Sequence, residues 1–175
     1  MPKYRKMLNE WDAPYIQALV KVIETQSTQT LTAWTVDYAE SVLLPIWNKH
    51  CPSDLRPKSA LSAARAWLNG EAKPAQVKPA VKECDTAARE MEANPTAQAA
   101  ARGIGQCAGT VYTATHAIGL ALYGALAVAY DTLGIDAAWP QFEQRAGEEC
   151  ERMLAALQAV AVPDEPNPAK ISWKC

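Results

Sequence analysis

The feature that most constrains the fold of this chain is a run of 28 residues, 103–130, that contains no Asp, Glu, Lys or Arg. An uncharged segment of this length either spans a membrane or forms a helix buried on all sides in a helical bundle. The run also contains glycines, threonines, Gln106 and His116, so it is only moderately apolar. Because polar side chains are costly in a bilayer, we expect a buried central helix and no membrane span. A break of this run near Gly103–Gly109 is the alternative to one continuous helix.

The rest of the chain also carries helical patterns. No segment alternates apolar and polar residues with the two-residue period of a strand, and alanine, the best helix former, is abundant throughout. Apolar residues recur at three- and four-residue spacing in five further segments, at about 13–26, 28–47, 54–70, 75–93 and 136–161. We therefore predict an all-α, single-domain bundle of about six helices around a buried Ala/Gly-rich central helix.

Prolines and glycines mark several boundaries in this pattern. Pro57 is suited to the first turn of its helix, and Gly70 to a left-handed cap at the end of the same helix. Pro45 should kink the second helix or end its regular part. Because three prolines fall within six residues after residue 162, we predict a helical domain over 1–162 and an extended Pro-rich tail over 163–175.

Composition narrows the compartment and the partners. A net charge of −2, with no run of Lys and Arg, predicts no nucleic-acid partner. The five cysteines are widely spread and include no C-x-x-C pair, so we expect free thiols in a reducing compartment. The N-terminal segment lacks an apolar core of signal-peptide length, and this predicts a cytoplasmic protein.

Signals for catalysis or for a bound cofactor are weak. The chain has two histidines, His50 and His116, and no H-E-x-x-H motif, phosphate loop or dinucleotide fingerprint. We expect His116 to be a hydrogen-bonded core histidine, and we keep a general base as the alternative. The sequence therefore predicts no catalytic residue, no metal site and no cofactor.

Charged residues on the second and third predicted helices form a more informative pattern. Arg56 and Arg65 lie nine residues apart, about two and a half turns, and we expect both to project along nearly the same side of their helix. Asp37 and Glu40 form an acidic pair on the preceding helix, which a short connection keeps nearby. A clamp between the two helices is one hypothesis; arginines held ready for an acidic group on a partner protein are the other.

Three segments carry a family resemblance: WTVDYAESVLLPIW, LRPKSALSAARAWLNGE and AARGIGQCAGTVYTATHAIGLALYGALA. They resemble a bacterial family of immunity proteins, small all-helical proteins assigned to toxin–immunity loci, over about residues 30–130. The pattern falls here on an acidic helix with Asp37, Ala39 and Glu40, and on an alanine-rich helix with His116. Between them, the signature helix carries Arg56, Pro57, Ala60, Ala64, Arg65, Trp67, Gly70 and Glu71.

The resemblance implies a non-enzymatic protein that binds and neutralises a cognate toxin. The expected contacts are exposed charges such as Glu83, Asp85, Glu90, Glu92, Glu143, Glu148 and Glu149. One alternative is a small-ligand binder or an enzyme, with a polar pocket built from Asp37, Glu40, Arg56, Arg65 and His116. Another is a homo-oligomer that uses the glycine-rich helix as its interface.

Overall fold

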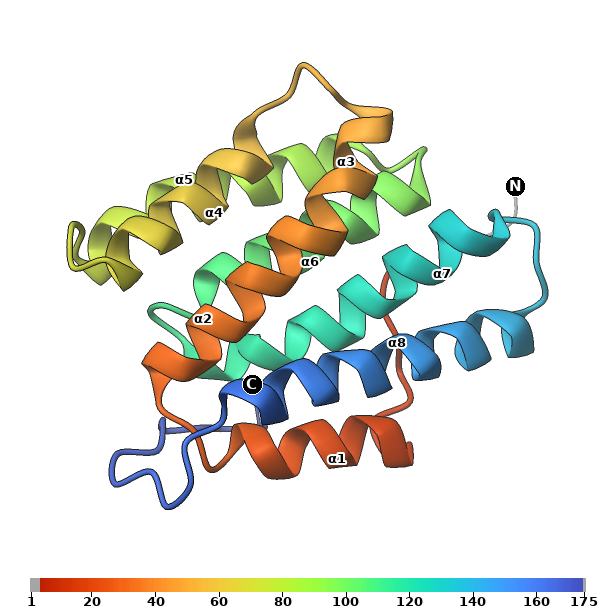
Figure 1. The fold of residues 1–175 in the computed structure, drawn as a ribbon. Coiled ribbons are helices and arrows are strands. Elements are labelled where there is room, and N and C mark those ends of the chain that lie inside the picture. The colour runs from red at the N-terminus through yellow and green to blue at the C-terminus, as the bar shows by residue number, and fades with distance from the viewer. Residues whose placement is uncertain (1–3, 175) are drawn as a thin grey trace.

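The computed structural model describes residues 4–174, which form helices joined by short turns and contain no strand (Figure 1). The α-helices are α1 (Pro14–Ile23), α2 (Thr28–Tyr38), α3 (Leu44–His50), α4 (Arg56–Leu68), α5 (Pro74–Glu90), α6 (Pro95–Gly109), α7 (Leu126–Leu133) and α8 (Trp139–Val160). Three short segments join them, namely the π-helical η1 (Ala39–Leu43) and η3 (Leu120–Ala125) and the 3-10 helix η2 (Ala114–Ile118). The prediction of an all-α fold is confirmed, although the structure divides the chain more finely than the six expected helices.

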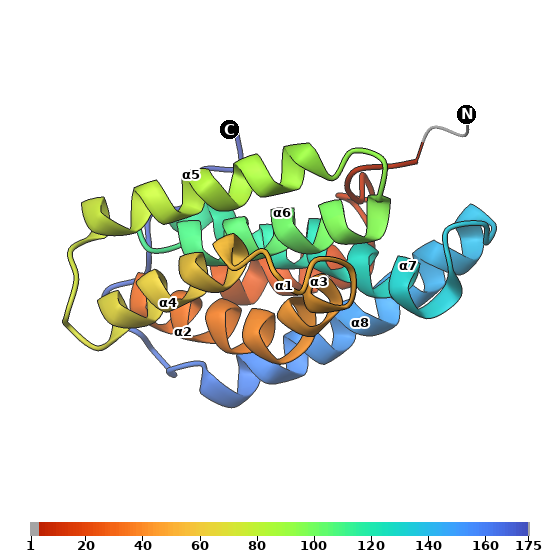
Figure 2. The same cartoon turned by 90° about the horizontal axis from the view of Figure 1, so that it is seen from above.

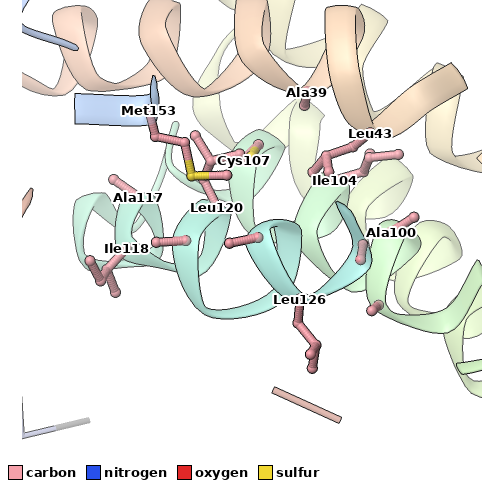
Figure 3. Packing of buried hydrophobic residues seen from close by; sticks show 14 of the residues in the cluster. Ala39, Leu43, Ala100, Ile104, Cys107, Ala117, Ile118, Leu120, Leu126 and Met153 are labelled. Carbon is pink, nitrogen blue, oxygen red and sulfur yellow. The ribbon is translucent and has the colours of Figure 1, made fainter. Parts of the chain in front are cut away.

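Helix α6 is buried along most of its length. It contacts α2, α3, α4, α5 and α7, and Figure 2 shows α5 covering it on the outside of the molecule. A Cβ atom at Gly103 would lie 2.8 Å from Leu43 Cδ1 and 3.2 Å from the backbone nitrogen of Gly124. Only glycine therefore allows α6, η1 and η3 to approach this closely. The buried core around this contact includes Leu43, Ile104, Leu120 and Met153 (Figure 3).

The uncharged run is not one helix, which corrects the expected boundaries. The chain turns after Gly109, and η2, η3 and α7 follow; η3 and α7 pack back against α6. Glycine, threonine and valine, which are poor helix formers, occupy residues 109–111 and 113 at the turn. Residues Ala114–Leu133 are long and apolar enough to cross a membrane, but 67% of the 18-residue window is buried inside the fold. A core helix of a globular protein meets the same criteria, so this segment is weak evidence for a membrane protein.

The path from α2 to α3 is continuous and passes through the π-helical turn η1 just before Pro45. Proline has no N–H, and its ring would clash with the carbonyl of residue 41 in a regular α-helix. The wider π turn absorbs this conflict without ending the helix. It also places Glu40 next to the end of α2, which carries Asp37.

The described residues that follow α8, 161–174, form no helix or strand. They turn at 163–164 and bend at 166–167, so the expected extended tail is instead a looped segment, and it lies against the turn between α1 and α2 (Figure 1). The backbone N–H of Ala169 donates to the carbonyl of Gln26 (2.8 Å), and the N–H of Val162 donates to Gln26 Oε1 (2.7 Å). Trp173 Nε1 donates to Glu24 Oε1 (2.7 Å), and its ring stacks at a tilt on Trp11, with centroids 5.3 Å apart. The end of the chain is therefore held to the helical body.

Candidate functional site

Arg65 joins α4 to the end of α2 and to η1. Its Nη2 donates to Asp37 Oδ1 (2.5 Å) and to Glu40 Oε2 (2.8 Å). The hydrogen bond that Arg65 donates to Glu40, and then the one that it donates to Asp37, raise the pKa of Arg65. The side chains of Arg65, Asp37 and Glu40 are 35%, 62% and 40% exposed, so this is a surface cluster and not a buried ion pair. Water screens such pairs, and their contribution to the free energy of unfolding is about 0–1 kcal/mol.

Arg56 forms a second cluster, with different partners. Its Nε and Nη2 donate to the Asp54 carboxylate, at 2.6 Å for Nη2–Oδ2, and Nη2 also donates to Glu90 Oε2 (2.6 Å). The hydrogen bond with Arg56 lowers the pKa of Asp54 and that of Glu90. The Asp54 carboxylate also accepts the backbone N–H of Arg56 (3.1 Å) at the start of α4. This cluster ties the beginning of α4 to the end of α5.

The expectation that Arg56 and Arg65 share one side of their helix is wrong. An α-helix turns by about 100° per residue, so nine residues amount to two full turns and about a half. The half turn places the two guanidinium groups on opposite sides of α4. One arginine therefore meets α2 and η1, and the other meets α5.

His116 lies in a third place, on η2, where its ring packs edge-on against Tyr112 with centroids 6.3 Å apart. Its buried Nδ1 has no hydrogen-bond partner in the described chain, and it lies 2.9 Å from where a Cβ at Gly109 would stand. Burial lowers the pKa of His116, and the charge of Asp85 on α5 partly offsets this effect. His116, which was expected to be a hydrogen-bonded core histidine, is thus only half-buried. The acidic residue near it is Asp85, and neither Asp37 nor Glu40 lies there.

The five residues of the expected network or pocket thus fall in three separate places. Within residues 4–174, no group of three or more His, Cys, Asp and Glu side chains is arranged to hold a metal ion. A surface hollow of about 520 Å³ lies elsewhere, between the N-terminal segment and the start of α6. Its lining is Tyr4, Arg5, Lys6, Met7, Asn9, Glu92, Pro95 and Gln98.

The sequence matches the family model described as "Imm-5 like putative immunity protein" over residues 21–159. The chain belongs to this family. The match is wider than the resemblance over residues 30–130, and it includes α2 to α7, both arginine clusters and nearly all of α8. The N-terminal segment and the extended tail lie outside it. No curated protein and no solved structure matches the chain.

The signature helix of this immunity-protein family member is fixed at both ends. Pro57 is buried in the first turn of α4, where its missing N–H costs no hydrogen bond. At the other end Gly70 adopts a φ of +76°, and the N–H of Glu71 donates to the carbonyl of Ala66 (2.9 Å). This is the Schellman arrangement, and it confirms the predicted left-handed cap. Trp67 is half-buried and packs against the core.

Glu149 of α8, which was expected to be an exposed contact residue, is the centre of a buried cluster that the sequence did not predict. Glu149 is only 2% exposed. Tyr38 Oη donates to Glu149 Oε1 (2.5 Å), and Arg145 Nη2 lies 3.0 Å from Oε2, while Arg152 Nη1 lies 3.6 Å away. Burial, and then the hydrogen bond to Glu149, raise the pKa of Tyr38. Spacing could have revealed the burial, because Glu149 follows Phe142 by seven residues on the buried face of α8.

The other expected contact carboxylates divide by exposure and by partner. Asp85 and Glu143 are half-buried, whereas the remaining four are exposed. Two of these four already have a cationic partner: Glu90 is bound by Arg56, and Glu92 lies 3.4 Å from Lys6 Nζ.

Proposed function

We propose that this chain is a non-enzymatic immunity protein that binds a cognate toxin protein and neutralises it. The observation that carries the proposal is membership of the immunity-protein family over residues 21–159. Such a protein acts by occupying a surface of its toxin, so it needs a stable scaffold and a partner-matched exterior.

The geometry of the two arginine clusters supports a binding role. Each arginine is bound by two carboxylates, so Arg56 and Arg65 restrict the positions of the surface side chains around them. A surface fixed before association loses less conformational entropy on binding. The alternative of a polar pocket has no comparable support, because its five residues lie apart.

The proposal includes a cytoplasmic location, without a cofactor, a nucleic acid or a membrane as partner. Free thiols suit a reducing compartment, and the described cysteines that are free are Cys51, Cys84, Cys107 and Cys150. Gly103, Gly105 and Gly109 are buried within the chain's own fold. We therefore do not include self-association through the glycine-rich helix in the proposal.

Co-expression with a toxin-domain protein encoded next to this chain tests the proposed function. We expect growth to be restored, and the two proteins to co-elute in size-exclusion chromatography. Growth arrest that persists while this chain is soluble and expressed in excess would refute the proposal for that toxin.

A further inference from the structure

Helix α5 lies on the outside of the molecule (Figure 2) and carries a basic flank beside its buried face. Four of its residues follow one another at spacings of four, three and four, which keeps them within a sector of about 60° around the helix axis. They are Lys78, Lys82, Asp85 and Arg89. The three cationic side chains are exposed, and they extend over 11 residues of sequence, or about 16 Å along the axis.

The neighbouring elements add to this flank. Burial raises the pKa of Asp85, and the charges of Arg102 on α6 and then of Arg89 partly offset this effect. Lys78 Nζ lies 5.3 Å from the centre of the Tyr112 ring, in a cation–π contact. We define the α5 basic flank as Lys78, Lys82, Arg89 and Arg102.

None of these four cations forms an ion pair with a carboxylate within residues 4–174, and the same holds for the isolated exposed lysines Lys21 and Lys58. Arg89 Nη2 donates to the hydroxyl of Thr86 (2.7 Å). What distinguishes the flank is that its cations lie together. Asp85 lies among them, but its Oδ1 packs over Gly105 and makes no salt bridge. The Nε of Arg102 is buried and has no hydrogen-bond partner in the described chain.

The opposite flank of α5 has the reverse charge. Glu83 and Glu90 lie about 80–160° around the axis from the residues of the basic flank, and Arg56 of α4 binds Glu90 on that side. The helix thus presents carboxylates toward α4, and unpaired cations toward the C-terminal end of α6 and η2.

From this separation of charge we propose that the α5 basic flank is a contact surface for the toxin, and that it binds an acidic surface of that protein. The inference rests on the proposed function and names the chemistry of the partner. Discrete carboxylate side chains can reach the four cations while avoiding Asp85 and the acidic flank. A continuous phosphate backbone cannot avoid them as easily, so the same observations favour a protein over a nucleic acid.

The first experiment uses chemical probes and a matched control. The variant Lys78→Glu/Lys82→Glu reverses two charges on the basic flank; Lys21→Glu/Lys58→Glu makes the same change at exposed lysines on α1 and α4. Binding to poly-L-glutamate and to a 20-base-pair DNA duplex is measured at low and at physiological salt, with the melting temperature as a check on folding. We expect poly-L-glutamate binding that weakens with salt and falls about tenfold or more in the flank variant, but within about twofold in the control.

Equal loss in both variants would overturn the inference, because binding would then follow net charge alone. Tighter binding to the duplex than to poly-L-glutamate would also overturn it, and would indicate a nucleic-acid surface. The co-expression assay with the neighbouring toxin is then repeated with the flank variant. Rescue by the unmodified chain and equal rescue by the flank variant would refute the contact surface and leave the proposed function standing. Failure of the unmodified chain would refute the proposed function, while the probe experiment would still decide the charge preference of the flank.

Discussion

Replacing Glu149 by alanine tests whether the buried cluster between α2 and α8 stabilises the fold. The side chain is almost fully buried, and its removal leaves the Tyr38 hydroxyl without its acceptor and the Arg145 guanidinium without its ion-pair partner. Loss of one partner from a buried ion pair costs about 3–5 kcal/mol. Because Arg145 is 17% exposed and can regain some water, we expect the lower part of this range, about 3 kcal/mol.

A second variant separates charge from hydrogen bonding at the same position. Glu149→Gln keeps an acceptor for Tyr38 but removes the charge that Arg145 and Arg152 face, so we expect a smaller loss of about 1–2 kcal/mol. Glu148→Ala, at an exposed neighbouring position, serves as the control and should change the free energy of unfolding by less than about 0.5 kcal/mol.

Urea denaturation followed by circular dichroism measures all three variants, and the midpoint multiplied by a constant m-value gives each change. A decrease in the free energy of unfolding of less than about 1 kcal/mol for Glu149→Ala would show that the buried cluster does not stabilise the fold. So would equal losses for the alanine and glutamine variants, because the charge would then carry none of the effect.

Three further predictions concern packing, surface pairing and pH. Gly103→Ala should lower the free energy of unfolding by about 1–3 kcal/mol, because the added methyl group would press on Leu43 and on the Gly124 backbone; an unchanged thermal midpoint would contradict this close contact. Arg65→Ala should cost less than about 1 kcal/mol in urea denaturation, since its ion pairs are at the surface, and a loss above about 3 kcal/mol would mean that the cluster behaves as a buried pair. Burial, and then the charges of Glu143 and Glu10, raise the pKa of Tyr15 to about 12. Because the pKa of tyrosine in the unfolded chain is about 10, the unfolded chain releases this proton first as pH rises. The free energy of unfolding should therefore fall between about pH 10 and pH 12, and less steeply in Tyr15→Phe. Stability that rises across this window would contradict the assignment.

Local signals explain why the helical class and several boundaries could be predicted from the sequence. The signature helix was expected over about 54–70 and extends over Arg56–Leu68, because Pro57 and Gly70 act through their own backbone conformations. The effect of Pro45 was likewise predictable, although the π turn that accommodates it was not. A break near Gly103–Gly109 could be suggested from the glycines, and α6 ends at Gly109. The packing of η3 and α7 back on α6 could not, because it depends on contacts between segments that no local pattern indicates.

Among the site residues, contacts between neighbouring helices could be predicted, whereas contacts between distant parts of the chain could not. The pairing of Arg65 with Asp37 and Glu40 follows from two helices that are neighbours in the chain, and it was expected. The pairing of Arg56 with Glu90 joins residues 34 apart in sequence, and no local pattern indicates it. The opposite orientation of the two arginines could have been obtained from helix geometry alone.

Titration of the purified toxin with this chain, with residual toxin activity measured against the molar ratio of the two proteins, tests whether the chain neutralises the toxin by binding it. We predict that activity falls linearly and ends at a fixed stoichiometric ratio, and that the toxin is recovered with unchanged mass after the complex is separated. Loss of activity at far less than stoichiometric amounts, or a change in the mass of the toxin, would show that this chain acts as an enzyme and would contradict the proposed function.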